Sequence, residues 1–162
     1  MGIIVSYEII SEENILKEIE KNMNTAIDIE SILNQYPHYI QSFTSFVKTW
    51  DPLYMLLYKI SGNNIFNKLR ENKQSEKINQ YTKIFDYEEV KLLYKELQEI
   101  SIDTLNNKLN DEFLKAEISE ESGYHMEYIY DSDCIVIEFN ELKNAVSKAY
   151  ILNSKLIQIL FP

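Results

Sequence analysis

Hydrophobic residues between positions 49 and 62 repeat with the period of an α-helix. The apolar residues at i, i+3, i+4 and i+7 are Leu53, Leu56, Leu57 and Ile60. This spacing places them on one face and predicts a buried central helix of about ten residues, roughly 15 Å long. Asp51 is suited to cap this helix and Pro52 to occupy its first position, while Gly62 offers a left-handed exit.

Alternating apolar and polar residues predict a strand at each end of the chain. Residues 1–10 alternate, and so do residues 155–161, KLIQILF. We expect these two strands to pair in one small sheet, because such pairing would suppress fraying of both ends. Residues 78–85 predict a further short strand or extended segment. Residues 38–47 fit either a helix face or an irregular segment, and both interpretations stay open.

Helical periodicity recurs along the rest of the chain. It predicts helices over residues 12–23 and about 28–35, the second ending before Pro37. A helical hairpin follows, and its first helix begins at Asp86, which has Glu89 three residues later as in a capping box.

The second helix of the hairpin is predicted to run from Asp103, as its cap, to Gly123, as its exit. Its apolar stripe contains Leu105, Leu109, Phe113 and Ala116. Residues 62–77 are rich in Asn and Lys and are expected to form a surface connection.

Two periods compete near the C-terminus. Alternation would make residues 134–139 a strand, whereas a period of 3.6 links apolar positions from Ile135 to Ala149. The second pattern is longer and favours a helix over at least residues 140–152. Residues 133–139 stay open between strand and helix.

Composition indicates one helix-rich domain. The chain has 162 residues, of which 45% are apolar, and this is enough to bury a core without disulfides. Glycine and proline number only three each, which disfavours a sandwich or barrel built on many tight turns. We therefore predict a single α+β domain over residues 1–162, with a small sheet that includes the N- and C-terminal strands.

The net charge of the chain limits the kinds of molecule that it is expected to bind. Asp and Glu total 26 against 16 Lys and Arg, a net charge of −10 at pH 7. Such a field repels nucleic acid and anionic lipid and would attract a protein with a basic surface. No apolar run approaches the length of a membrane span. Cys134 is the only cysteine, so no internal disulfide forms and we expect a cytoplasmic location. The sequence specifies no oligomeric state.

Catalytic and cofactor motifs are absent from the sequence. His38 and His125 stand far apart and outside any metal motif, and three scattered glycines build no phosphate-binding loop. We therefore predict no metal site, no cofactor and no catalytic residue. The most suggestive group of titratable residues is Glu120, Glu121, His125 and Glu127, which could hold a cation or transfer protons. A solvated polar loop explains the same pattern and is the favoured interpretation.

Four segments resemble the bacterial YfbM-like family, a domain of unknown function. They are MGIIVSYEIISEENI, TWDPLYMLLYKISG, FDYEEVKLLYKELQEISIDTL and FNELKNAVSKAYILNSKLIQILF, which together cover most of the chain. Trp50, Asp51, Leu53 and Gly62 match the centre of the family pattern. Tyr54 stands where the family usually has histidine, so no role of that histidine is carried over. The resemblance implies a fold and no established activity.

Two classes of function follow from these features. The first is a non-catalytic protein-binding module, an immunity-type or regulatory partner that binds another protein through an aromatic and carboxylate surface. The candidate binding residues are Trp50, Tyr54, Glu121, His125 and Tyr128, and the first four of these are the residues expected in the pocket of the second class. The alternative is a small-molecule-binding or hydrolytic enzyme with a pocket between the central helix and the loop at residues 120–130. Tyr and Trp suit either class because each combines a large apolar area with a polar tip.

Overall fold

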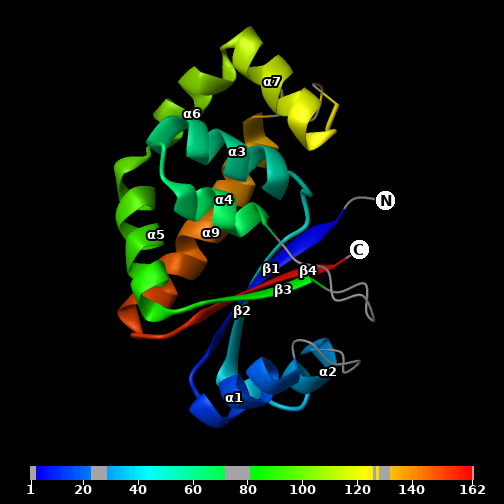
Figure 1. Cartoon of the computed structure of the whole chain (residues 1–162), viewed down its shortest axis with the longest axis vertical. Coiled ribbons are helices and arrows are strands. Elements are labelled where there is room, and N and C mark those ends of the chain that lie inside the picture. The colour runs from blue at the N-terminus through cyan, green and yellow to red at the C-terminus, as the bar shows by residue number, and fades with distance from the viewer. Residues whose placement is uncertain (1–2, 23–28, 72–80, 126, 128–131, 162) are drawn as a thin grey trace.

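A four-stranded antiparallel sheet places the two ends of the chain side by side at its centre (Figure 1). The computed structural model describes residues 3–22, 29–71, 81–125, 127 and 132–161. The strand order is β2 (Ile40–Ser45), β1 (Ile4–Ile10), β4 (Leu156–Phe161) and β3 (Tyr81–Phe85). The predicted α+β class and the pairing of the terminal strands are confirmed. The open segment at residues 38–47 contains β2, preceded by a 3-10 helix, Pro37–Tyr39.

The pleat of the sheet separates two hydrophobic cores. Alternate residues of β1, including Val5 and Tyr7, belong to the larger core, whereas Ile10 belongs to the smaller one. In β4, Leu156 and Leu160 face the larger core, while Ile157 and Ile159 face the smaller. Successive side chains of a strand point to opposite faces, so each central strand supplies both cores.

Among the described residues, six helices enclose the larger core. They are α3 (Trp50–Ser61), α4 (Asn64–Arg70), α5 (Tyr87–Glu99), α6 (Ile102–Leu109), α7 (Glu112–Ser122) and α9 (Ser132–Ile151). The segment 133–139, whose pattern fitted both a strand and a helix, lies within α9, so these residues are helical. Its residues at helical spacing from Ile135 to Ala149 are buried, which explains why the 3.6 period prevails.

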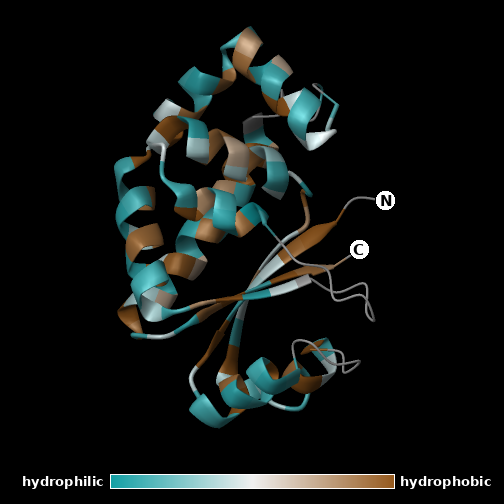
Figure 2. Cartoon of the chain, viewed as in Figure 1, coloured by the Kyte–Doolittle hydropathy of each residue, from teal (hydrophilic) through white to brown (hydrophobic). Residues whose placement is uncertain are grey.

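In the part of the chain that the structure describes, two helices cover the opposite face of the sheet. They are α1 (Glu13–Asn22) and α2 (Ile29–Leu33), and their apolar residues form the smaller core with Ile157 and Ile159 (Figure 1). Figure 2 shows hydrophobic and hydrophilic stretches alternating along α1 and α5, as expected of helices with one buried face.

The central helix α3 has twelve residues and ends, as predicted, at Gly62 with a left-handed φ of 71°. The prediction that Asp51 caps it is wrong. The cap position is Thr49, whose side chain makes no capping hydrogen bond. Asp51 lies in the first turn and pairs with Arg70 instead, because its side chain is buried beside that guanidinium.

Two further predictions are corrected by the helices that follow α3. The expected surface connection after Gly62 contains α4, which is capped by the Asn63 side chain and buries Ile65, Phe66 and Leu69; residues 72–77 lie outside the described residues. The single helix expected from Asp103 to Gly123 is two helices, because Ser101 caps α6 and Asp111 caps α7.

The break between α6 and α7 places Phe113 at the surface, whereas the sequence pattern predicted that it is buried. The sequence places it in a buried stripe, but in the structure its side chain is 90% exposed, and Ala116 is exposed as well. The buried residues of α7 are Lys115 and Ile118. Restarting the helix at Asp111 shifts which of its residues face the core.

We predict that Asp111→Ala lowers the free energy of unfolding by about 1 kcal/mol, the typical cost of losing an N-cap. The Asp111 carboxylate accepts hydrogen bonds from the backbone N–H groups of Phe113 and Leu114 at 3.0 and 3.2 Å. Asp103→Ala is the matched control and should cost less than about 0.5 kcal/mol, since Ser101 caps that helix. Urea denaturation in moderate salt measures both, and equal losses would contradict the two-helix arrangement.

Candidate functional site

Trp50 connects the first turn of α3 to Ile3, the residue that precedes β1. Its indole N–H donates a hydrogen bond of 3.1 Å to the backbone carbonyl of Ile3. Its ring lies 5.7 Å from that of Tyr54, centroid to centroid, and its side chain is 8% exposed. Trp50 is therefore fixed in place with only a small edge accessible to a partner.

Tyr54 lies fully inside the molecule, in a polar network between α3 and the sheet. Its hydroxyl is hydrogen-bonded to the Tyr7 hydroxyl and accepts a hydrogen bond of 2.9 Å from the side-chain amide of Gln158. Burial raises the pKa of Tyr54 well above its ordinary value. The neutral phenol thus connects α3 to both central strands.

Glu138 of α9 is a buried carboxylate beside this network. It is 0% exposed and accepts hydrogen bonds from the Ser45 hydroxyl, at 2.8 Å, and from the backbone N–H of Thr49. Burial raises its pKa to about 7, against hydrogen bonds that lower it. The sequence did not single out Glu138, because this residue lies in the segment 133–139, whose apolar pattern fitted both a strand and a helix.

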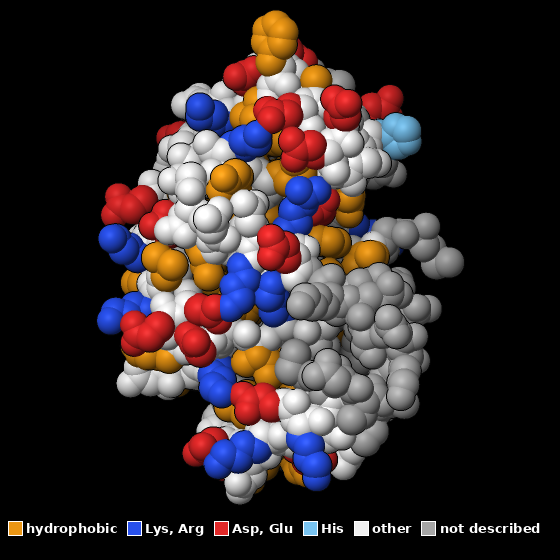
Figure 3. Space-filling model, in the orientation of Figure 1, with side chains coloured by type: hydrophobic (Ala, Val, Ile, Leu, Met, Phe, Trp, Pro, Cys, Tyr) orange, Lys and Arg blue, Asp and Glu red, His pale blue; other side chains and the backbone are white. Residues whose placement is uncertain are grey.

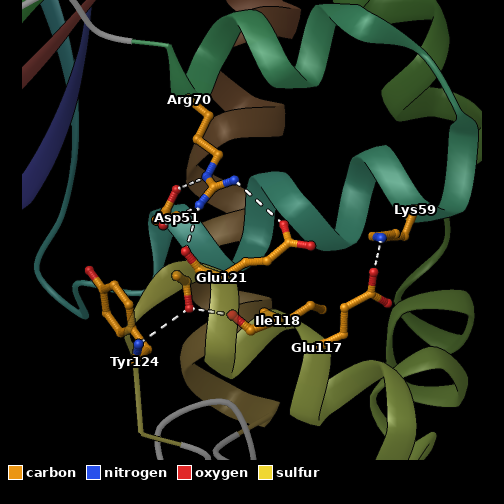
Figure 4. Close-up of polar contacts among 8 residues, drawn as sticks. Asp51, Lys59, Arg70, Glu117, Ile118, Glu121 and Tyr124 are labelled. Atoms are coloured by element: carbon orange, nitrogen blue, oxygen red, sulfur yellow. Dashed lines mark hydrogen bonds and ion pairs between the residues drawn. The ribbon is translucent and has the colours of Figure 1, made fainter.

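Arg70 brings the predicted residue Glu121 to the beginning of α3 (Figure 4). Its Nε donates to Asp51 Oδ1 at 2.5 Å and its Nη2 to Asp51 Oδ2 at 3.3 Å. Nη2 also donates to the backbone carbonyl of Glu121 at 3.2 Å, and Nη1 lies 3.9 Å from the Glu121 carboxylate. We call these three residues the Arg70 brace, because they join α3, α4 and α7.

The remaining residues that the sequence analysis singled out lie in the last turn of α7 or follow it in the sequence. His125 is exposed, and so are Glu120 and Glu127. Tyr128 lies outside the described residues. The structure therefore brings Glu121 close to the helix that carries Trp50 and Tyr54, and leaves His125 on the surface. Within the described ranges, no three His, Cys, Asp or Glu side chains are placed to hold a metal ion.

The end of the molecule formed by α6 and α7 carries an acidic surface with exposed apolar side chains. We call residues 101–125 the acidic apex; they include six acidic and two basic residues, a net −4 of the chain's −10. Phe113 is 90% exposed here and Ile102 is 41% exposed. Figure 3 shows acidic side chains gathered over this end with hydrophobic ones among them. Lys59 and Arg70 pair with Glu117 and Glu121 along its edge.

Comparison with known proteins reveals a family without an assigned function. The model of the family described as "Domain of unknown function (DUF1877)" matches residues 1–159. The crystal structure of YfbM from Escherichia coli, a protein of unknown function, superposes with a TM-score of 0.63 at 12% identity. The alignment covers 97% of this chain and 99% of that one, and it shows a shared fold. None of the curated proteins matches the chain. In the part of the chain that the structure describes, no helix has the length and apolarity to cross a membrane.

We predict that Arg70→Met lowers the free energy of unfolding by about 2 kcal/mol at pH 7, because it leaves the buried Asp51 carboxylate without its partner. Burial already raises the pKa of Asp51, and Arg70 opposes that shift. Without Arg70 the carboxyl takes up a proton at higher pH, so the loss should shrink as the pH falls toward 4.

Lys59→Met is the matched control for this variant. It removes the Lys59–Glu117 ion pair, which lies at the surface, so it should cost less than about 1 kcal/mol at either pH. Denaturant unfolding measures both variants. A loss for Arg70→Met that is small and independent of pH would contradict the brace.

We predict that Glu138→Gln removes a component of the pH dependence of stability. The folded-state pKa of Glu138, about 7, lies above the ordinary value of 4.5, so the unfolded chain ionises first and stability falls as the pH rises from about 4.5 to 7. The variant should gain up to about 3 kcal/mol relative to the wild type across that window. Glu120→Gln, at an exposed position, should follow the wild-type curve. Parallel curves for Glu138→Gln and wild type would refute the assignment.

Proposed function

The chain belongs to the DUF1877 family, and we propose that it is a non-catalytic, cytoplasmic protein-binding module that docks a basic partner through its acidic apex. The partner would be one that the chain neutralises, as an immunity-type protein does, or regulates. The observation that carries the proposal is the exposure of Phe113, whose side chain is 90% accessible on a well-capped helix.

Phe113 has the properties of an interface anchor. The Asp111 cap fixes the first turn of α7, so the backbone that carries the ring has little freedom to lose on binding. Burying a phenylalanine side chain contributes roughly 1.5–3 kcal/mol. Aromatic side chains that enter a pocket dominate many protein interfaces. A large apolar side chain held outward therefore supports protein binding.

The charge around Phe113 supports a basic partner. Asp111 and Glu112 precede it directly in the sequence, and the whole chain carries −10. Glu112 pairs with Lys115, so the excess of acidic residues over the whole apex, and not Glu112 alone, supplies the negative field. Complementary fields raise the rate of encounter and disfavour acidic competitors. Glu121 and His125 belong to the same apex and would extend the contact, while Trp50 and Tyr54 would act by positioning α3 beneath it.

The polar groups near α3 support a binding role over a hydrolytic one. Asp51 and Glu121 are both engaged by Arg70, and Tyr54 is inside the core with a raised pKa. A general base must be free to reach its substrate within hydrogen-bonding distance. The small-molecule or hydrolytic alternative at this position therefore has less support.

We predict that Phe113→Ala weakens the complex with the basic partner about 30-fold or more, the effect of an anchor worth 2 kcal/mol. Candidate partners are the products of neighbouring genes, each co-expressed with the chain and tested for a stoichiometric complex by size-exclusion chromatography. Calorimetry then gives the dissociation constant at two salt concentrations, and affinity should fall as salt rises.

Ile151→Ala is the control, because Ile151 is 74% exposed but lies at the end of α9, outside the apex. It should bind as the wild type does. Equal weakening by the two variants, or no stoichiometric complex with any candidate, would overturn the proposal.

A further inference from the structure

A hollow of about 550 Å³ lies on the sheet face opposite the larger core. Strands β1 and β2 form its floor, and α2 with the following 3-10 helix forms one wall. The floor carries a polar cluster made of Ser6, Glu8, Ser42 and Thr44. The rest of the lining includes the apolar side chains of Ile4, Leu33, Ile40, Phe46 and Phe161. A concave apolar site with a few convergent polar groups is the usual form of a small-molecule site.

The hydrogen bonds of the floor have one consistent direction. The Ser6 hydroxyl donates to Glu8 Oε1 at 2.5 Å, and the Ser42 hydroxyl donates to Glu8 Oε2. Ser6 Oγ also lies 2.8 Å from Thr44 Oγ1. A hydroxyl has only one proton, and Ser6 uses its own on Glu8, so Thr44 donates to Ser6. All three hydroxyl protons are thus used within the cluster.

The cluster therefore offers only acceptor lone pairs to whatever enters the hollow. Glu8 is 5% exposed at the bottom, whereas Thr44 is half-buried and Ser42 is exposed, so the hydroxyl oxygens line the way to the carboxylate. None of the described lining residues is Lys, Arg or His. An anion would meet repulsion from Glu8 and, among the described lining side chains, a neutral donor in the Asn34 amide, whereas a cation with N–H donors would meet the hydroxyl acceptors and the Glu8 carboxylate.

We propose that this hollow binds a small organic cation: an ammonium or guanidinium group that lies against Ser42, Thr44 and Glu8, carried on an apolar body that packs on the walls. The Glu8 carboxylate at the bottom of the hollow favours a ligand with a positive charge, and the apolar lining favours a ligand with an apolar body. In Figure 1 α2 and α7 lie at opposite ends of the molecule, so this site is separate from the acidic apex. The inference does not depend on the proposed protein partner.

Titration with three five-carbon probes that differ in the charge of their head group tests the ligand class. Pentylammonium, pentanol and pentanoate are each added to the ¹⁵N-labelled chain while amide chemical shifts are followed. We expect saturable shifts in β1, β2 and α2 with pentylammonium, at least tenfold weaker binding of pentanol and no binding of pentanoate. Comparable binding of pentanoate or pentanol, or no saturable shift with pentylammonium, would overturn the proposal.

Two variants and one control locate the site. Glu8→Gln keeps the size and one of the two acceptor oxygens, replaces the other with an NH2 donor and removes the charge, and should weaken pentylammonium binding at least tenfold. Asn34→Trp places a large side chain from an exposed lining position into the hollow and should block binding with Glu8 intact. Glu120→Gln removes one exposed charge at the acidic apex and should bind as the wild type does. Unchanged binding to Asn34→Trp, or equal weakening by Glu8→Gln and Glu120→Gln, would contradict the site.

Discussion

The pairing of β1 (Ile4–Ile10) with β4 (Leu156–Phe161) is the constraint on which the rest of the structure depends. These strands are central in the sheet although they come from opposite ends of the chain. Each sends alternate side chains into both cores, so one ladder fixes the helices on both faces. Closing so long a loop costs entropy that grows only slowly with length, and burial of two cores offsets it.

The same ladder positions both proposed binding regions. Ser6 and Glu8 belong to β1 itself, so the floor of the hollow is as rigid as the sheet. The acidic apex is farther away and is connected through α3, which the Tyr54 hydroxyl joins to both central strands and Arg70 joins to α7. Sites held by rigid elements retain their geometry in the absence of a ligand, which lowers the cost of binding.

Patterns within a few neighbouring residues were sufficient to predict those helices and strands that depend mainly on their own sequence. Alternation identified the terminal strands, and the apolar spacing with Gly62 identified α3. The helix break before Phe113 also had a local signal, because Asn110 and Asp111 are typical of a helix end and a new cap, but the apolar period was given more weight. Asp51 was misassigned because its partner, Arg70, is nineteen residues away and the contact exists only after folding.

The binding regions were the least predictable part. Glu121 was singled out from its neighbours, but its contact with Arg70 depends on how α4 and α7 pack. Glu8 looked like the solvent-facing residue of an alternating strand, and its burial requires β2, from a segment whose pattern fitted two interpretations. The sequence shows which side chains share one face of a strand or helix. Whether that face is buried or exposed depends on which distant segments pack against it.

Native-state hydrogen exchange tests the central role of the β1–β4 ladder most directly. The slowest amide protons of both strands should exchange only through global unfolding, with the free energy that denaturant unfolding gives, and no helix should be more protected. If the slowest amides of α3 and α9 persist while those of β1 and β4 exchange at a free energy more than about 1 kcal/mol lower, the helices hold together without the ladder and the account is wrong.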